Sequence, residues 1–342
     1  MRSRGVRRLD HRVFYQPVRN PSAMKYEIAL ATYNGRRFLP ELLLSIANQS
    51  LRPERILLAD DGSTDGTRDL VSSLCDALCL PVVWCTGDEH LGACANFGRA
   101  LLRTQEQYVF LADQDDVWDH NKAQRTLEAV LRAEQRWGSA APVLAHSDLR
   151  IVDEELGLLA NSYFLKQGLT ESRVGFCDLL LQNVVIGCTT AVNRPLLEKA
   201  LPIPTGAAMH DWWLALVAAA FGHIETIAET TIAYRQHGGN EVGARRIDAD
   251  FIRKKVHELR SRSECASKVL SPVVTQAQAW IQRFGAMPDG RGGALVRELC
   301  SFRTQTGTER IKRALLLGAR RHGLLRTVAF YWALLWGKFG SE

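Results

Sequence analysis

Residues 108–118 read YVFLADQDDVW, and this stretch decides how the chain is organised. It begins with an apolar run, which predicts a buried strand. Asp113, Asp115 and Asp116 follow at the end of that strand, where ligands bind in open α/β sheets. Carboxylates this close repel one another, and a divalent cation would relieve the repulsion because hard cations prefer oxygen ligands. The alternative is that Asp113 or Asp115 caps a helix that begins near Trp118.

Strands and helices alternate on both sides of this stretch. This alternation is typical of βαβ units, and it predicts an α/β fold with a mostly parallel central sheet flanked by helices. Neither G-x-G-x-x-G nor G-x-x-x-x-G-K-[ST] occurs, so phosphates would be held by a metal and side chains. Strands are expected at 26–31, 55–59, 81–85, 107–111 and 143–146, and helices at 38–49, 67–78, 95–102 and 118–136.

The second half of the sequence is less regular. We expect a loop and a strand at 183–192, a helix opened by Pro195, an apolar helix at 209–221, and a strand at 226–234. From about residue 247 the pattern is helical and basic. These patterns predict a basic, disordered extension at 1–23, a main domain at 24–245, and a helical, basic C-terminal region at 246–342, with Met24 as an alternative start.

Composition narrows the class of protein. The chain has 342 residues, 46% hydrophobic content and a formal charge of +6, with no zinc-finger spacing or RNA-binding aromatic signature, so nucleic acid is not expected as a partner. Eight cysteines include no C-x-x-C pair, and the basic N-terminus is not followed by an apolar signal core. These features favour a cytoplasmic protein with reduced thiols.

The basic ends of the chain favour an anionic membrane surface as a partner. Residues 1–23 carry six arginines against Asp10 alone, and the apolar, aromatic run at 324–336 is flanked by basic residues. That run is shorter than the roughly 20 residues a spanning helix needs. It is therefore expected either to lie in a membrane interface or to dock on the core of the protein.

Polar residues follow three of the predicted strands, at positions that face one crevice in a parallel sheet. A nucleotide would fit in this crevice. Asp61 could accept a hydrogen bond from an N–H of its base or from a ribose hydroxyl, and Asp113 could bind ribose hydroxyls. Asp115 could bind a metal that bridges the diphosphate. Each has an ordinary structural alternative, because Asp60-Asp61-Gly62 makes a good turn and Tyr33 could be simple packing.

The start of the apolar helix near 210 is a second polar site. Asp211 could cap this helix, or it could face the crevice as a general base within reach of the proton it removes. Trp212 and Trp213 could wall a sugar pocket or pack in the core. His237 lies in a glycine-rich turn and could be a metal ligand or a donor to phosphate.

The sequence contains five polar motifs in the order 31–35 (ATYNG), 59–65 (ADDGSTD), 111–118 (LADQDDVW), 210–213 (HDWW) and 234–240 (YRQHGGN). In this order they resemble the family 2 glycosyltransferases, the inverting nucleotide-sugar enzymes with the A-type, Rossmann-like glycosyltransferase fold. Their residues are most similar to those of bacterial rhamnosyltransferases of surface-polysaccharide assembly, which implies dTDP-rhamnose or a UDP-sugar as donor. The resemblance covers residues 25 to about 243 and makes 24–245 the catalytic domain.

The resemblance implies a role for each matching position. Asp211 matches the catalytic base, Asp113 belongs to both the nucleotide site and the D-x-D element, and Asp115 and His237 match positions that hold Mg²⁺ or Mn²⁺. The remaining nucleotide-binding candidates are Thr32, Tyr33, Asn34 and Asp61, and the candidates for the acceptor site or the pocket wall are Asp116, Trp118, His210, Trp212 and Trp213.

The implied reaction is the attack of an acceptor hydroxyl, deprotonated by Asp211, on the anomeric carbon opposite the nucleotide. The acceptor would be a glycan or a lipid-linked glycan. Inverting glycosidases use the same logic with water as the attacking group, and a metal would neutralise charge on the leaving diphosphate. The competing predictions are a pyrophosphorylase-like enzyme, whose basic glycine-rich signature is missing near the first strand, and a non-catalytic membrane-associated scaffold.

Overall fold

A computed structural model describes residues 24–85, 87, 90–170, 173–238, 262–285 and 290–337. The predicted extension at 1–23 and the predicted boundary at 245 lie outside the described residues. The same holds for Gly239 and Asn240, the last two residues of the 234–240 motif.

Four parallel strands form the first part of the sheet, in the order β3-β2-β1-β4. In the register of this sheet Thr32 pairs with Asp60, and Ala31 pairs with Asp113. The polar residues that end three separate strands therefore meet at one edge, as the sequence predicts. The strands are β1 (Tyr26–Thr32), β2 (Arg55–Asp60), β3 (Val82–Trp84) and β4 (Tyr108–Asp113).

Beyond β4 the sheet is mixed rather than parallel. β8 (Ala191–Asn193) runs antiparallel to both β4 and β6 (Val143–Val152), whereas β9 (His223–Arg235) runs parallel to β6. The short strand β5 (Val117–Trp118) pairs antiparallel with β9, and β7 (Leu158–Ala160) pairs antiparallel with β6. The β5–β9 pairing brings the acidic loop that follows β4 beside the end of β9.

The helix expected to begin near Trp118 begins later. Trp118 lies in β5, and α4 (Lys122–Trp137) has Asn121 at its N-cap, with no side-chain cap hydrogen bond. Neither Asp113 nor Asp115 therefore caps a helix, and that alternative is wrong. The reason is the pairing of β5 with β9, a long-range contact that the local pattern does not contain.

Helices cover both faces of the sheet, which explains why its central strands are apolar on both sides. Along β1, Ile28 and Leu30 join one core cluster, whereas Ala29 joins the other. The first face is covered by α4 and by α1 (Leu39–Ala47), with α2 (Thr67–Ala77) beyond α1. The second face is covered by α3 (Ala93–Leu101) and by α8 (His210–Phe221), an almost wholly buried helix.

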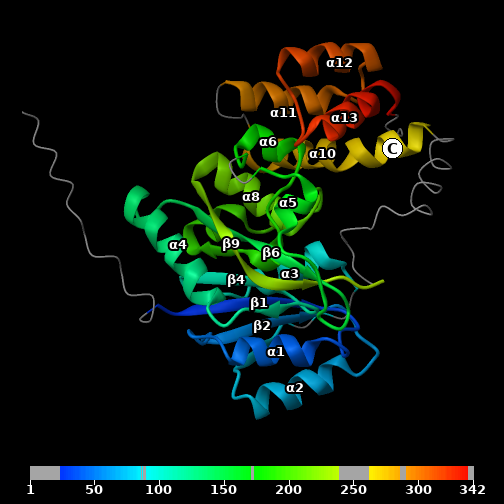
Figure 1. The fold of residues 1–342 in the computed structure, drawn as a ribbon. Coiled ribbons are helices and arrows are strands. Elements are labelled where there is room, and N and C mark those ends of the chain that lie inside the picture. The colour runs from blue at the N-terminus through cyan, green and yellow to red at the C-terminus, as the bar shows by residue number, and fades with distance from the viewer. Residues whose placement is uncertain are drawn as a thin grey trace, which may run out of the picture.

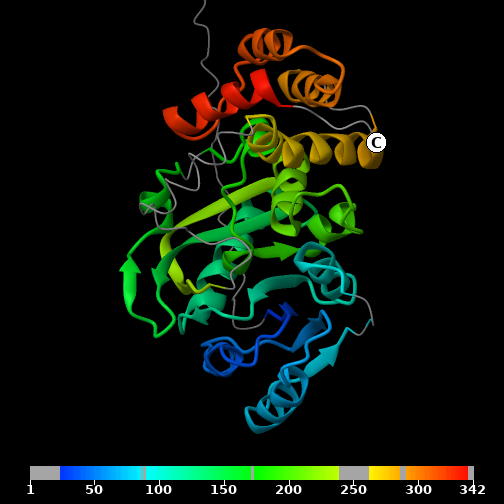
Figure 2. The same ribbon diagram turned by 90° about the vertical axis from the view of Figure 1, so that its right-hand side faces the viewer.

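The C-terminal helices stack on the second face, at the end of the molecule remote from α1 and α2 in both views (Figure 1, Figure 2). Trp280 of α10 packs against Trp213 of α8, with ring centroids 5.7 Å apart, and both side chains are fully buried. One hydrophobic core therefore joins these helices to the sheet. The helices are α5 (Tyr163–Gln167), α6 (Phe176–Leu181), α7 (Arg194–Ala200), α10 (Arg262–Phe284), α11 (Arg291–Ser301), α12 (Gly307–Leu316) and α13 (Leu324–Trp336).

The apolar helix α13 has two different faces. Phe330, Ala333 and Leu334 are buried against neighbouring helices, whereas Leu324 and Leu325 are 78% and 85% exposed. The inner face thus docks on the core, one of the two expected arrangements. Among the described residues, none of the helices combines the length and apolar character that a membrane span requires.

Candidate functional site

A cavity of about 960 Å³ opens at the carboxyl edge of the sheet, between the ends of β1 and β4 and the start of α8. The C-terminal helices close it on another side through Lys268, Val269 and Pro272 of α10 and through Arg321. Eight of the predicted site residues line this one cavity: Thr32, Tyr33, Asp61, Asp113, Asp115, His210, Asp211 and Trp212.

The acidic loop holds its two cavity-lining carboxylates by different contacts. Asp113 ends β4, whereas Asp115 lies in the loop, with its Oδ2 2.8 Å from Nε2 of His237. The His237 ring is itself held by stacking on Phe38, with centroids 4.6 Å apart. His237 does not line the cavity, so it reaches the site through Asp115.

Asp116 is fully buried behind the acidic loop and does not line the cavity. The amide of Arg235 donates to its Oδ1 at 3.2 Å, and the thiol of Cys188 also donates to this carboxylate. Burial, and then the neighbouring charges of Asp115 and Asp113, raises the pKa of Asp116 well above its usual value. The prediction that Asp116 contributes to the pocket wall is wrong, because β5 turns its side chain inward.

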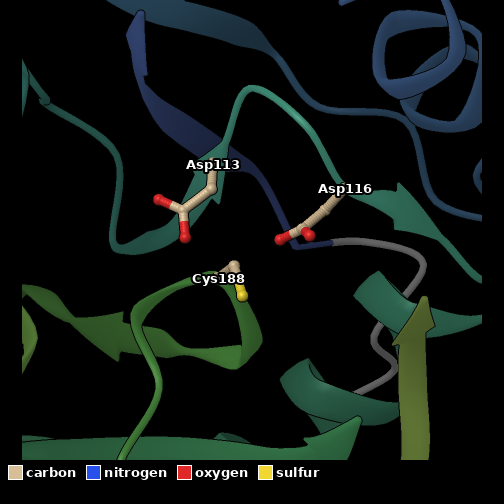
Figure 3. A group of neighbouring side chains, drawn as sticks. All are labelled: Asp113, Asp116 and Cys188. Atoms are coloured by element: carbon tan, nitrogen blue, oxygen red, sulfur yellow. The ribbon is translucent and has the colours of Figure 1, made fainter. Parts of the chain in front are cut away.

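Asp113, Asp116 and Cys188 form a cluster in which one ligand atom of each lies within 4.8 Å of the others. Figure 3 shows both carboxylates pointing toward the thiol. Burial is the first cause that raises the pKa of Cys188, followed by Asp116. A buried, protonated thiol is a poor ligand for a hard cation, so this cluster is better explained as packing that supports the loop.

The carboxylates on the cavity side fit a divalent cation such as Mg²⁺ or Mn²⁺. Asp113 and Asp115 offer oxygen ligands where a diphosphate would lie, and such cations share one or two carboxylates with substrate phosphates. The imidazole of His237 orients Asp115 in the way that outer hydrogen bonds orient metal ligands.

The nucleotide-site candidates at the ends of β1 and β2 form hydrogen bonds with neighbouring side chains and backbone amides. The hydroxyl of Thr32 donates to Oδ1 of Asp60 at 2.8 Å. The carboxylate of Asp61 accepts from the amides of Leu91 and Gly92 at 2.7 and 2.8 Å. Asp61 therefore anchors the start of α3 and faces the cavity with its remaining lone pairs.

Tyr33 is half exposed and is held in place from two sides. Its backbone N–H and C=O bond the side-chain amide of Gln114 at 2.9 and 3.0 Å, and its ring lies 4.7 Å from that of His90. Asn34, the fourth nucleotide candidate, does not line the cavity. Its side-chain oxygen accepts from the amide of Thr64 at 2.9 Å, so it holds the turn after β2 instead.

Asp211 lies in the first turn of α8 and has three donors around its carboxylate. Gly187 N donates to Oδ2 at 3.0 Å, Asn183 Nδ2 donates to Oδ1 at 3.3 Å, and the amide of Trp212 also donates to Oδ1. Burial raises the pKa of Asp211 to about 6, and these donors limit the rise. The N-cap is Met209 rather than Asp211, so the capping alternative is wrong.

Of the three tryptophans predicted to line the pocket, one faces the cavity and two are buried in the core. Trp212 lines the cavity and its indole N–H donates to Leu179 O, whereas Trp213, about 100° further round the helix, is fully buried and donates to Ala200 O at 2.9 Å. Trp118 is 3% exposed and packs on Phe110, with centroids 5.9 Å apart. The prediction that Trp118 and Trp213 line the pocket is therefore wrong.

His210 lines the cavity as a neutral ring. It stacks on Phe97, with centroids 3.8 Å apart, and burial lowers its pKa to about 3. Neither ring nitrogen has a hydrogen-bond partner among the described residues. Both nitrogens are thus available to a bound ligand.

Several residues of the site were missed in the sequence. Asn183 and Gly187 were assigned only to a loop, and Gln114 only to the acidic motif. Their contacts with Asp211 and Tyr33 bridge at least 24 residues of chain, so no local pattern contains them. A polar Asn183 and a glycine within an otherwise apolar run were the available signal.

Comparisons with known proteins agree with this geometry. The Glycosyl transferase family 2 pattern matches residues 27–145. The chain is 28% identical over 230 residues to an uncharacterized glycosyltransferase of Nostoc sp., a match that covers 64% of this chain and 66% of that protein, just under two thirds. It is 26% identical over 231 residues to the dTDP-rhamnosyl transferase RfbG of Shigella flexneri, covering 63% and 74%.

The fold has a counterpart among solved structures. The structure of S. aureus TarS 1-349 in complex with UDP-GlcNAc superposes with a TM-score of 0.54 at 14% sequence identity. The superposition covers 86% of this chain and 80% of that one. At this identity the likeness shows the fold alone.

Proposed function

We propose that this chain transfers a sugar, with inversion and with a divalent metal, from a nucleoside-diphosphate donor to a hydroxyl of a glycan or lipid-linked acceptor. The Glycosyl transferase family 2 pattern over residues 27–145 supports the proposal, as does the fold shared with S. aureus TarS. The process would be the synthesis of a surface polysaccharide. The observation that carries the proposal is that Asp211 and Asp115 line the same cavity. A base and a diphosphate site that open into one cavity are what an inverting transfer requires.

Asp211 is proposed as the general base. It accepts the proton of the acceptor hydroxyl while that oxygen forms a bond to the anomeric carbon and the bond from that carbon to the diphosphate breaks. Its pKa of about 6 suits the task, because a base with a pKa near the working pH is both deprotonated and sufficiently basic. Asn183 and Gly187 hold the carboxylate toward the cavity.

The donor is proposed to bind along the edge of the sheet. Thr32, Tyr33 and Asp61 would hold the base and ribose, and Asp113 and Asp115 would hold Mg²⁺ or Mn²⁺ beside the diphosphate. When bound, the metal would supply charge neutralisation for the leaving diphosphate. The relative RfbG, named a dTDP-rhamnosyl transferase, supports dTDP-rhamnose as the first donor to test, with UDP-sugars as the alternative.

A donor-hydrolysis screen tests the proposal. The full chain is incubated with dTDP-rhamnose and several UDP-sugars, with Mn²⁺, with Mg²⁺ and with a chelator, and release of the nucleoside diphosphate is measured. We expect release from one donor, only with metal. A parallel reaction with added pyrophosphate that yields a nucleoside triphosphate and a sugar 1-phosphate would instead indicate pyrophosphorylase chemistry, and binding of every donor without turnover would favour a scaffold.

The location is proposed to be the cytoplasm, at the inner face of the plasma membrane. No disulfide joins any of the eight cysteines in the part of the chain that the structure describes, as is usual for a protein of a reducing compartment. Several apolar side chains of α12 and α13 are exposed and have basic residues near them in the sequence, which suits an anionic lipid surface. They are Leu315, Leu316, Leu324, Leu325 and Val328.

Flotation on vesicles tests the membrane contact. We expect the chain to float with vesicles that contain phosphatidylglycerol and less with phosphatidylcholine alone, and Leu325→Asp to reduce the fraction that floats. The matched control is Leu44→Asp, because Leu44 is 50% exposed on α1, at the end of the molecule remote from α13 (Figure 1). Equal loss in both variants would contradict the proposal.

A further inference from the structure

The wall of the cavity that the C-terminal helices supply is positively charged. Lys268 of α10 and Arg321, in the segment between α12 and α13, both line the cavity. The wall at the sheet edge carries Asp61, Asp113, Asp115 and Asp211 instead. The two ends of the cavity therefore have opposite charge.

In the part of the chain that the structure describes, no carboxylate neutralises the charge on this second wall. Among the described residues, no carboxylate oxygen lies within 4 Å of the Lys268 or Arg321 side chain, although the same criterion finds partners for Arg37, Arg55 and Arg150. Burial, and then the positive charge of Arg326, lowers the pKa of Arg321 to about 10. A guanidinium held among cations and away from water is costly unless an anion binds to it.

Arg321 is also only partly used as a hydrogen-bond donor. Its Nη2 donates to Val269 O at 3.1 Å, and this is its one side-chain hydrogen bond among the described residues. Its buried Nε–H has no partner there. The ring of Phe330 lies 5.2 Å beneath the guanidinium and fixes its plane, which leaves a rigid fork of the kind that binds phosphate.

Tyr163 links this wall to the proposed base. It lines the cavity. Its pKa is raised, mainly by burial; the positive charge of Arg326 opposes this rise, and the negative charge of Asp211 adds to it. The phenol therefore lies within electrostatic reach of the base and of Arg326, the same cation that acts on Arg321. An acceptor with its hydroxyl at Asp211 would extend past Tyr163 toward Arg321.

We propose that Arg321 and Lys268 bind a phosphate group on the acceptor, so that the acceptor is a phosphorylated glycan rather than a neutral one. This inference rests on the proposed function, and it adds the substrate class of the acceptor end of the same cavity. The phosphate could come from a lipid-linked glycan or from a soluble sugar phosphate, and the experiment below separates these sources.

The test is a titration of the full chain, followed by tryptophan fluorescence, because Trp212 lines the cavity. The probes are octyl phosphate, glucose 1-phosphate and octyl β-glucoside, in buffer without divalent metal. We expect binding of a phosphate probe and not of the neutral glucoside. Preference for octyl phosphate would identify a lipid phosphate, and preference for glucose 1-phosphate a soluble one.

Four variants make the result specific. Arg321→Gln and Lys268→Gln should each weaken phosphate binding by about tenfold, since a charge-assisted bond is lost. Arg321→Lys, which keeps the charge, should recover most of the affinity. Arg320→Gln is the matched control, because Arg320 is exposed, outside the cavity and one residue away, and it should leave the affinity unchanged.

Donor hydrolysis in the same variants separates this inference from the proposed function. Arg321→Gln and Lys268→Gln should hydrolyse the donor at the wild-type rate and lose only transfer to the phosphorylated acceptor. If they instead lose affinity for the nucleoside diphosphate, these cations serve the donor and the inference is wrong. Equal binding of octyl β-glucoside, or equal weakening by Arg320→Gln, would also overturn it, whereas a wild-type chain that hydrolyses no donor would overturn the proposed function.

Discussion

The two walls of the cavity are built in different ways. The wall at the sheet edge consists of residues at strand ends, whose positions follow from the register of β1 with β2 and β4, together with Asp211 at the start of α8. The wall from the C-terminal helices carries long cationic side chains on α10 and on the segment before α13. Under the proposed function, backbone pairing positions most of the donor site, whereas recognition of the acceptor depends on side chains of the C-terminal region.

Replacing the proposed base should have the largest effect and tests the first wall. We expect Asp211→Asn to lower the rate of transfer by about 10³-fold, within the range typical of general-base catalysis, and to keep donor affinity unchanged. Steady-state kinetics and a calorimetric donor titration measure the two quantities. Asp69→Asn, an exposed aspartate on α2, is the control, and near-normal turnover of Asp211→Asn would remove Asp211 from its role.

The same variant should be more stable than the wild type at neutral pH. The pKa of Asp211 is raised from 3.8 to about 6, so the folded state holds the proton more tightly than the unfolded state does. The contribution of this proton to the free energy of unfolding is fully present below about pH 4. It is lost as the pH rises through about 6, and it amounts to at most about 3 kcal/mol. Urea unfolding at pH 4 and pH 8 should show a gain for Asp211→Asn only at pH 8.

Crowding the loop beside the base should have the next largest effect. A Cβ added at Gly187 would lie 2.9 Å from Nε2 of His210 and 3.4 Å from Cβ of Asp211. We expect Gly187→Ala to lower turnover by about 10²-fold, because small displacements of a catalytic group cost this much. Gly98→Ala is the control, since its Cβ would meet only Ile203 at an ordinary 3.8 Å, and equal loss there would indicate a general effect on folding.

The first wall could be predicted from the sequence because its signals are local. Apolar runs that end in polar residues place Thr32, Asp61 and Asp113 at strand ends, and parallel strands then bring these ends together. The family resemblance predicted that Asp211 faces the same crevice as these residues. The corrections at Asp116 and Trp118 have one cause, which is the pairing of β5 with β9 more than 100 residues along the chain.

The second wall could not be predicted in the same way. Its helices were expected as a basic tail, but their position on α8 depends on contacts such as Trp213 with Trp280. The hydrophobic pattern of the sequence does not specify these tertiary contacts, because any large apolar side chain on α10 could fill the same space. The sequence likewise gave no reason to select Arg321 from the neighbouring Arg320, since only packing decides which of them faces the cavity.

Removing the residue that orients Asp115 should have a smaller effect. We expect His237→Ala to weaken metal-dependent binding of the nucleoside diphosphate by about tenfold, the lower end of what partners of metal ligands contribute. A calorimetric titration with Mn²⁺ measures it. His223→Ala, whose ring stacks on Trp137 away from the cavity, is the control, and unchanged affinity in His237→Ala would show that Asp115 needs no such partner.

The smallest expected effect is a change in pH dependence at the base. Transfer requires ionised Asp211, so activity should fall tenfold per pH unit below about pH 6. Asn183 donates to the ionised carboxylate at 3.3 Å and therefore favours its charged form. Asn183→Ala should move the acid limb of the profile to higher pH while the rate at pH 8 changes by less than about tenfold.

This pH shift separates a positioning role from general damage to the cavity. A structural defect would lower the rate at every pH and leave the acid limb in place, whereas loss of one donor to the base changes the limb itself. Asn183→Asp should move the limb further in the same direction, because a second carboxylate beside Asp211 raises the pKa of the pair. If both variants keep the wild-type pH profile, the acid limb reports the titration of another group. The hydrogen bond from Asn183 then does not set the basicity of Asp211.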